Sequence, residues 1–274
     1  MNEDTLTDSD FYWREKGEIK ILVCRALENA GFVNGFSTRD GGVSRFPAGS
    51  LSLSGFDQDE VANIEENRRR FFDALGVSHK LACVRQVHGD TIVRIDGGDS
   101  SGDLETPADG MISDAEGVIL GSKTADCVPV LICDPKTKAF AAVHAGWRGT
   151  VRRITAKAVE KMVAEYRSDP KDMIAAIGPA ASGRSYEVGR EVIDAFTSNF
   201  PEAEHLFDPT REGHALIDLH LANAEQLHGA GIRKENIHVS PFCTMESPDL
   251  FFSYRIDGAK YGKTGRLLSV IGRA

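Results

Sequence analysis

The sequence AAVHAGWRGT at residues 141–150 joins the end of an apolar run to a glycine turn and the start of a helical pattern. The apolar run predicts a strand over residues 139–144, which ends at His144. Ligands of α/β proteins usually bind where strands end. We therefore expect His144 and the nearby Arg148 to lie at the rim of a sheet and to face a ligand.

Strand and helix patterns alternate along most of the chain. The predicted strands cover residues 81–87, 117–121, 128–133, 139–144, 173–177, 237–240 and 267–271, and another strand ends near Phe36. The predicted helices cover residues 59–76, 150–166, 188–199 and 216–227. This order predicts an α/β fold, a single domain with mixed β-sheets packed between helices in an α/β/β/α-like arrangement. We expect a flexible N-terminal tail at residues 1–10 and one domain at residues 11–274.

The composition limits the kinds of partner. A chain of 274 residues with 41% hydrophobic residues can bury a large core without disulfides. Its net charge of −9 and isoelectric point near 5.4 give no overall attraction to nucleic acid or to an anionic membrane. We therefore expect a small-molecule partner, no nucleic acid and no membrane. We also expect a monomer, because the apolar C-terminal strand carries no clear interface signal.

The cysteine pattern and the N-terminal segment indicate a cytoplasmic protein. The five cysteines are odd in number and scattered without a CxxC pair, which fits reduced thiols better than a disulfide framework. The first ten residues are acidic and polar and lack the features of a signal peptide. No stretch approaches the roughly 18 consecutive apolar residues of a membrane span.

Three side chains at predicted strand edges carry metal-binding chemistry. They are His88, Cys127 and His144. Imidazole nitrogens and a thiolate are ligands that Zn²⁺ prefers, and three protein ligands leave a fourth position open for water or substrate. Their separation along the chain matches no short zinc signature, so only the tertiary fold can bring them together. A buried thiol with two hydrogen-bonded histidines is the alternative.

The same atoms allow a second kind of chemistry. Cys127 can act as a nucleophile with His88 or His144 as its base. Asp126, beside the thiol, can orient an imidazole or act as a general base on a bound water. An aspartate before a strand more commonly caps a backbone amide in a turn.

Arginines and aromatic residues offer contacts for an anion and a ring. Arg148 follows the glycine turn, where its guanidinium and helix N-terminal amides can face one anion. Arg39 and Arg45 lie on a glycine-rich loop and can close over a ligand, although most loop arginines are simply solvated. Tyr186 can stack on a planar ring, and so can the aromatic residues of LFFSYRIDG at 250–258, although such clusters more often belong to the core.

Several longer motifs occur together in this chain. They are RQVHGDTIV at 85–93, ADGMISD at 108–114, TADCVPVLICD at 124–134, AAVHAGWRGT at 141–150 and FFSYRIDGAKYGKTGR at 251–266. With these motifs the chain resembles, over roughly residues 31–272, the family long described as multicopper polyphenol oxidase or laccase-domain proteins and now regarded as purine nucleoside phosphorylases.

The resemblance implies an α/β fold of mixed sheets and a zinc ion held by His88, Cys127 and His144. It also implies phosphorolysis of adenosine, inosine, guanosine and 5′-methylthioadenosine, with adenosine deamination as a second activity. Copper is the less favoured metal, because a multicopper oxidase needs a histidine-rich trinuclear cluster that eight scattered histidines without an HxH motif do not supply.

Roles can be assigned to individual residues on this basis. We expect Asp126, Cys127 and Arg148 to be catalytic, with Arg148 and Arg39 as candidates for holding the phosphate and zinc with Asp126 serving deamination. The expected substrate-binding residues are Arg39, Arg45, Ser52 and Tyr186.

The chain departs from the family pattern near the expected site. Ser52 stands where the family has asparagine, and Ala180 and Ser185 stand at family cysteine positions. Lys123 just before TADC is a further charge that the pattern does not lead one to expect. These changes leave the three metal ligands intact and alter neighbouring walls, so they bear on substrate preference.

Two other functions fit the same residues. One is a cysteine- or zinc-dependent amidohydrolase acting on cell-wall precursors, which dependence on phosphate would distinguish from a phosphorylase. The other is a non-catalytic protein that binds a nucleotide-like ligand or scaffolds a division complex. The acidic composition and the complete set of metal ligands favour an enzyme.

Overall fold

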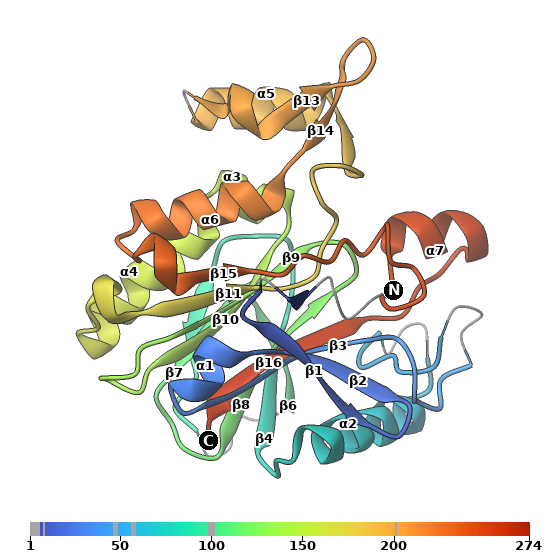
Figure 1. The fold of residues 1–274 in the computed structure, drawn as a ribbon, viewed down its shortest axis with the longest axis vertical. Helices are drawn as coiled ribbons and strands as arrows, with labels where there is room; N and C mark the ends of the chain where they lie inside the picture. The colour runs from blue at the N-terminus through green and yellow to red at the C-terminus, as the bar shows by residue number, and fades with distance from the viewer. Residues whose placement is uncertain (1–5, 8, 46–48, 56–58, 98–101, 201) are drawn as a thin grey trace.

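The computed structural model describes residues 6–7, 9–45, 49–55, 59–97, 102–200 and 202–274. Two β-sheets lie face to face between helices (Figure 1). Helices α3, α4 and α6 cover one side of this pair of sheets, and α2 covers the opposite side. The structure therefore confirms the predicted α/β/β/α-like layering and mixed sheets.

The larger sheet has seven strands in the order β1-β2-β3-β16-β8-β4-β6. These strands are β1 (Phe11–Lys16), β2 (Ile19–Cys24), β3 (Phe32–Ser37), β16 (Leu267–Arg273), β8 (Val118–Thr124), β4 (Lys80–Arg85) and β6 (Gly102–Pro107). Strand β4 runs parallel to β6 and β8, whereas the other neighbouring pairs are antiparallel.

The second sheet has six strands in the order β15-β11-β9-β10-β7-β5. These are β15 (Ile237–Val239), β11 (Ile174–Ile177), β9 (Val128–Cys133), β10 (Phe140–Ala145), β7 (Gly110–Ser113) and β5 (Ile92–Arg94). At its centre, β9 and β10 form an antiparallel hairpin whose twelve residues are all buried. The hairpin therefore forms the middle of the fold.

Helices and a small third sheet complete the structure. The helices are α1 (Arg25–Asn29), α2 (Val61–Leu75), α3 (Trp147–Val151), α4 (Ile154–Tyr166), α5 (Arg190–Asn199), α6 (Leu219–Gly229) and α7 (Tyr254–Tyr261). The third sheet is antiparallel and consists of β12 (Glu187–Gly189), β14 (His214–Ile217) and β13 (Phe207–Pro209). Together with α5, strands β13 and β14 lie beyond α3 and α6, at one end of the molecule (Figure 1).

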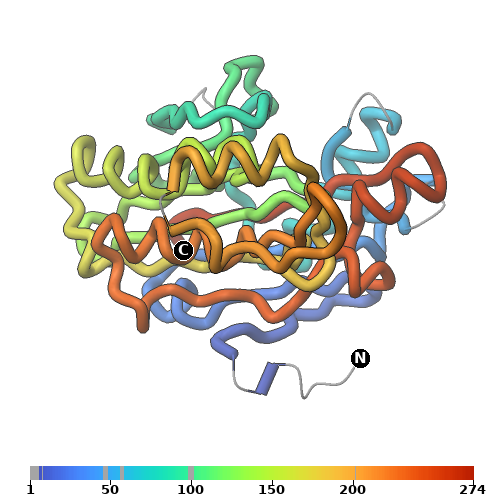
Figure 2. The backbone as a smooth tube through the Cα atoms, turned by 90° about the horizontal axis from the view of Figure 1, so that it is seen from above, coloured from blue at the N-terminus to red at the C-terminus, as the bar shows by residue number. Residues whose placement is uncertain are grey.

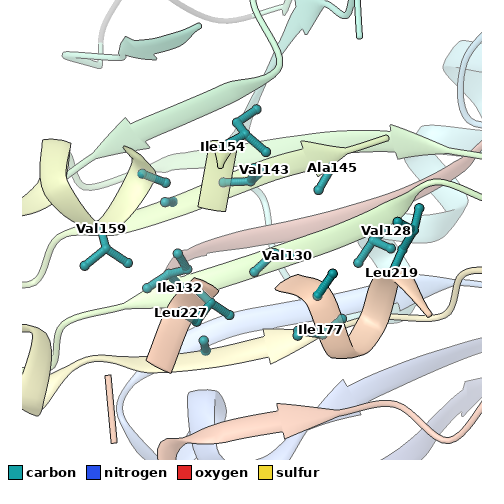
Figure 3. Close-up of a cluster of buried hydrophobic side chains, with 14 of the residues drawn as sticks. Val128, Val130, Ile132, Val143, Ala145, Ile154, Val159, Ile177, Leu219 and Leu227 are labelled. Atoms are coloured by element: carbon teal, nitrogen blue, oxygen red, sulfur yellow. The ribbon is translucent and has the colours of Figure 1, made fainter. Parts of the chain in front are cut away.

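Alternation along the central hairpin explains the layering. One face of the hairpin, with Val128, Val130 and Val143, packs under α4 and α6 (Figure 3). The other face, with Leu131 and Phe140, packs against the larger sheet. Because side chains alternate between the two faces of a strand, an apolar run that is buried on both faces specifies a sheet between two apolar layers.

The helix predicted at 150–166 is in fact two helices. Arg153 has a φ of 61°, which ends α3 before α4 begins at Ile154. The periodic apolar residues do not reveal this break, because the pattern continues on both sides of it. The break allows α3 to begin directly after the glycine turn at the end of β10.

Two other predicted features need correction, and a third, the aromatic cluster at 250–258, agrees with its expected place in the core. The helices predicted at 188–199 and 216–227 begin later, at Arg190 and Leu219, because the preceding residues pair as β12 and β14. Val61, expected in the buried stripe of α2, is 55% exposed because it is the first residue of the helix. The aromatic residues Phe251 and Phe252 are fully buried core residues.

Part of the predicted tail at residues 1–10 lies outside the described residues, namely 1–5 and 8. Asp10 is held in place, because its carbonyl accepts a hydrogen bond from the Arg25 amide and its carboxylate lies 2.6 Å from His238 Nδ1. Within the described ranges, none of the helices combines the length and apolar character that crossing a membrane requires.

Two glycines at helix ends test the backbone geometry. Gly76 caps α2 with a φ of 80°, whereas Gly229 is the last residue of α6 and lacks a positive φ; an added Cβ would meet nothing within 4 Å at either position. We expect Gly76→Ala to lower the free energy of unfolding by about 1 kcal/mol. Gly229→Ala should raise it by up to about 1 kcal/mol. Urea unfolding measures both, and equal effects would contradict the assigned conformations.

Candidate functional site

The pairing of β9 with β10 brings Cys127 close to His144. In this antiparallel pair Ala145 lies opposite Val128, so Cys127, which precedes β9, faces the end of β10 and the turn at Gly146. Both residues therefore reach the same end of the central hairpin. The prediction that His144 lies at the rim of a sheet is confirmed.

His88 comes from a connection between the two sheets. It lies between β4 of the larger sheet and β5 of the second sheet. Its φ of 56° is uncommon for a residue with a side chain, so the surroundings must hold it. The backbone amides of Val87, His88 and Gly89 donate to the carboxylate of Asp109 at 3.2, 2.9 and 2.7 Å. Asp109 therefore fixes the conformation of the His88 connection.

Asp109 also fixes the second histidine. Its Oδ1 lies 2.8 Å from Nδ1 of His144, and its carbonyl accepts from the His144 amide at 2.7 Å. Because Nδ1 is engaged, Nε2 is the nitrogen of His144 left to bind a metal. The Asp109 side chain is fully buried; burial raises its pKa, but hydrogen bonds from His144 and the Gly89 amide hold that pKa below its usual value.

The three predicted metal ligands form one cluster. Their ligand atoms all lie within 4.8 Å of one another, and among the described residues they make up the one such group of three. The two imidazole rings are 4.9 Å apart at 80°. A Cβ at Gly146 would lie 3.0 Å from Cδ2 of His88 and 3.3 Å from Sγ of Cys127, so glycine permits this approach.

The cluster fits zinc. Zinc bonds of about 2.3 Å to sulfur and 2.0–2.1 Å to nitrogen place tetrahedral ligand atoms roughly 3.5 Å apart, which small rotations of these side chains achieve. Two histidines and a cysteine also occur at mononuclear copper sites, so the ligands alone do not separate the two metals. Within the described ranges, no second cluster supplies the trinuclear centre of a multicopper oxidase.

Charge within the cluster favours a thiolate. Burial raises the pKa of Cys127, but the positive charge and hydrogen bonds of His144, with those of His88, lower it to about 6 from 9.0. Burial lowers the pKa of His144, but the Cys127 thiolate and Asp109 raise it to about 9 from 6.5. Each of these shifts favours the charged form, a thiolate on Cys127 and an imidazolium on His144.

Asp126 does not contact either imidazole. Its Oδ1 accepts from the Thr244 hydroxyl at 2.7 Å, and its Oδ2 accepts from the Ser253 hydroxyl at 3.0 Å and the Arg255 amide at 2.8 Å. Its φ is 85° and burial raises its pKa, which these hydrogen bonds lower in part. The carboxylate that faces an imidazole is Asp109, and not Asp126 as the sequence led us to expect. Asp126, the residue before Cys127, instead holds the start of α7 through Ser253 and Arg255.

Two of the expected substrate-binding residues have structural partners instead. Arg39 is buried, and its guanidinium binds the carboxylate of Asp257 at 3.3 Å and main-chain carbonyls that include that of Phe251. Figure 2 shows in red the α7 helix that this ion pair attaches to the early loop, drawn in blue. Ser52 is fully buried and bonds Ser54 and Arg266 through its hydroxyl. Loop residues are commonly exposed, but this loop is packed under α7.

The other residues singled out in the sequence differ in burial. Arg45 is exposed and borders residues 46–48, which lie outside the described ranges. Ser185 donates to Glu246 at 2.6 Å, and buried Ala180 bridges to Cys243. Lys123 lies 3.6 Å from Asp103.

A pocket of about 390 Å³ is lined by residues that follow the Gly146 turn, and not by the three metal ligands themselves. Its walls include Arg148, Tyr186 and Arg255, and both Arg148 and the neighbouring Trp147 follow directly after Gly146. Burial raises the pKa of Tyr186, and the negative charge of Cys127 raises it further, which indicates that Tyr186 lies near the thiolate. Tyr186 and Arg148 thus share one pocket.

Sequence reasoning missed Asp109 and Arg255. Both lie within quoted motifs, ADGMISD and FFSYRIDGAKYGKTGR. An aspartate directly before a strand and an arginine two residues after a helix cap were the available signals, but their partners come from distant segments.

Residues 33–274 match the family model described as multi-copper polyphenol oxidoreductase laccase. The chain belongs to this laccase family. One relative in the family, purine nucleoside phosphorylase YlmD of Geobacillus stearothermophilus, is 36% identical over 260 residues, covering 92% of this chain and 94% of the relative. Another, purine nucleoside phosphorylase YfiH of Escherichia coli, is 34% identical over 252 residues, covering 92% and 98%.

Solved laccase-family structures share the fold. The crystal structure of YlmD from Geobacillus stearothermophilus has a TM-score of 0.88 at 33% identity, covering 97% of this chain and 99% of that chain. The crystal structure of Bacillus licheniformis YfiH has a TM-score of 0.85 at 31% identity, covering 96% and 99%. The fold and the family expected from the sequence motifs are thereby confirmed.

Replacing Asp109 tests its hold on both histidines. We expect Asp109→Asn to lower zinc affinity about 10- to 100-fold, because an amide cannot accept from His144 and all three loop amides. Competition with a chelating dye measures this affinity. Asp134→Asn is the control, because Asp134 is equally buried and binds Lys136 and Thr137 in a turn away from the cluster. Equal zinc affinity in the two variants would contradict the role of Asp109.

The thiolate predicts a distinctive pH dependence. In metal-free protein, alkylation of Cys127 should reach half its maximal rate near pH 6, and His144→Ala should move this midpoint upward. Stability from the lowered thiol pKa is lost as pH falls through about 6, whereas stability from the raised His144 pKa is lost as pH rises through about 9. Between about pH 6.5 and pH 9 the two groups change the free energy of unfolding in opposite directions, and their contributions cancel. An alkylation midpoint near 9 would contradict the pair.

Proposed function

We propose that this chain is a zinc-dependent purine nucleoside phosphorylase acting on adenosine, inosine, guanosine and 5′-methylthioadenosine, with adenosine deamination as a second activity. The observation that carries the proposal is the convergence of His88, Cys127 and His144 on one cluster. The laccase-family relatives named purine nucleoside phosphorylase support the choice of reaction.

The protein's own groups prepare the metal site. His88, Cys127 and His144 would hold zinc, which when bound supplies Lewis acidity. Asp109 fixes the ring of His144 and the backbone at His88, so little reorganisation is needed on binding. Asp126 is best suited to position Cys127 and α7, since its oxygens already accept three hydrogen bonds. Its raised pKa supports a secondary part in proton transfer during deamination.

The adjoining pocket supports the nucleoside and phosphate. Phosphorolysis requires phosphate to lie behind the anomeric carbon and requires stabilisation of charge on the departing purine. Arg148 lies on the pocket wall and is half exposed, with its guanidinium 4.2 Å from the Trp147 ring centroid. Tyr186 supplies an aromatic wall for a purine. Arg39 and Ser52 support the loop and α7 and do not enter this pocket.

The setting agrees with a soluble substrate. The described cysteines are all free, which supports a reducing, cytoplasmic environment. We propose that purine nucleosides and phosphate are the partners, and that the enzyme, at residues 11–274, works as a monomer.

Phosphate dependence tests the reaction. Metal-analysed protein is incubated with adenosine, inosine or 5′-methylthioadenosine, with and without phosphate, and free base, ribose 1-phosphate and inosine are measured. We expect base release that requires phosphate and scales with one zinc ion per chain. Cys127→Ala should lower zinc content and base release by about 100-fold or more, because it removes a ligand.

Cys83→Ala is the matched control. Cys83 is fully buried on β4 and lies outside the cluster, so this variant should keep its zinc and its activity. Full phosphate-dependent activity in Cys127→Ala would refute the metal site. Base release that ignores phosphate would refute phosphorolysis.

One observation favours a second function. Cys127 is placed as a nucleophile, His144 as its base and Asp109 as the carboxylate that orients the base. Cysteine hydrolases use the same three groups. This arrangement supports an amidohydrolase acting on cell-wall precursors. Amide cleavage that persists after zinc is removed and does not need phosphate would establish it in place of the phosphorylase.

A further inference from the structure

We infer that Arg255 is the principal phosphate-binding residue of this protein, recognising a phosphate dianion in the pocket beside the metal cluster. The inference rests on the proposed function for its choice of inorganic phosphate as the source. The pocket, the charges and the anchoring of Arg255 carry it independently of the reaction.

The arginines that line the pocket differ in whether a carboxylate pairs with them. Three arginines line this pocket. Arg148 is paired with Glu191 at 3.1 Å and Arg211 with Glu187 at 2.9 Å. In the part of the chain that the structure describes, no carboxylate lies within ion-pair distance of the Arg255 guanidinium. This cation is therefore the one whose charge is most available to an incoming anion.

Arg255 lies near the N-terminus of α7. Ser253 caps this helix through a hydrogen bond to the Ile256 amide, so Arg255 lies in the first turn. A cation there faces the positive end of the helix dipole, which disfavours it. The buried carboxylate of Asp126 accepts a hydrogen bond from the Arg255 amide, and its negative charge offsets part of this cost. A bound anion would satisfy the guanidinium, because Asp126 and Ser253 already accept from the amides of Arg255 and Ile256.

A hydrogen bond fixes the backbone of Arg255 relative to the segment that carries Cys127. Asp126 is bonded to Cys127 through one peptide, and its carboxylate holds the Arg255 amide at 2.8 Å. Its carbonyl accepts from the Ala181 amide at 3.0 Å, which ties the segment before Tyr186 to the same point. The Arg255 backbone is therefore held by the residue that directly precedes a metal ligand.

The Arg255 guanidinium lies over the ring of Tyr186. It lies 4.9 Å from the centroid of the Tyr186 ring, and the charge of Cys127 reaches that tyrosine. Arg255 also shares a side-chain hydrogen bond with Tyr186, but a guanidinium carries five N–H donors, so others remain to pair with two phosphate oxygens. A phosphate held in this way would lie in the pocket that Tyr186 and Arg148 line.

Direct binding tests the inference without relying on turnover. The full-length, metal-analysed protein is titrated by calorimetry with inorganic phosphate and, separately, with adenosine 5′-monophosphate. Arg255→Met should weaken phosphate binding about 10- to 100-fold, and Arg255→Lys should restore part of it because the charge returns without the fork. Lys260→Met is the matched control, because it removes an exposed cation from the same helix outside the pocket.

Kinetics add a second readout where turnover occurs. Arg255→Met should raise the KM for phosphate by the same factor and leave the KM for the nucleoside nearly unchanged. Unfolding midpoints of Arg255→Met and Lys260→Met should agree, which shows that the variant remains folded.

The outcomes separate this inference from the proposed reaction. Phosphate binding that Arg255→Met weakens, in a protein without phosphorolysis, supports the anion site and refutes the phosphorylase. A loss confined to adenosine 5′-monophosphate supports the site and assigns its phosphate to a nucleotide. Affinities for both ligands that are equal in wild type and Arg255→Met, or no binding of either ligand by the wild type, overturn the inference.

Discussion

The carboxylate of Asp109 is the interaction on which the site depends. It accepts hydrogen bonds from three consecutive amides of the His88 connection and faces Nδ1 of His144. The first contact holds His88 at a positive φ, and the second fixes the orientation of the other ring. The His88 connection passes from one sheet to the other, so this carboxylate links that crossing to the end of β10.

The sequence predicted the layers well where burial alone decides the structure. The strand expected at 128–133 matches β9 at both ends, because all of its residues are apolar enough to be buried on both faces. It failed where the backbone changes direction without a change in the apolar pattern. Arg153 divides the helix expected at 150–166, and the regular spacing of apolar residues continues across it.

The site was predictable only in part for a related reason. Histidine and cysteine at strand ends are conspicuous in a sequence, and these three side chains do form one cluster. The partners of charged residues are set by tertiary pairing. Asp109 faces His144 because Gly110 pairs with Val143 across β7 and β10, and Arg39 is buried by an aspartate 218 residues later in the chain. Neither distance in sequence leaves a local signal.

The pocket beside the cluster is built from parts outside the two main sheets. Tyr186 and Arg211 come from the small third sheet and its flanking segments, and Arg255 comes from α7, whereas two metal ligands belong to the central hairpin and its approach. Mutations in these outer segments can alter recognition while the hairpin stays unchanged. The metal ligands and the pocket walls therefore lie on separate segments of the chain, so that a substitution in one group need not disturb the other.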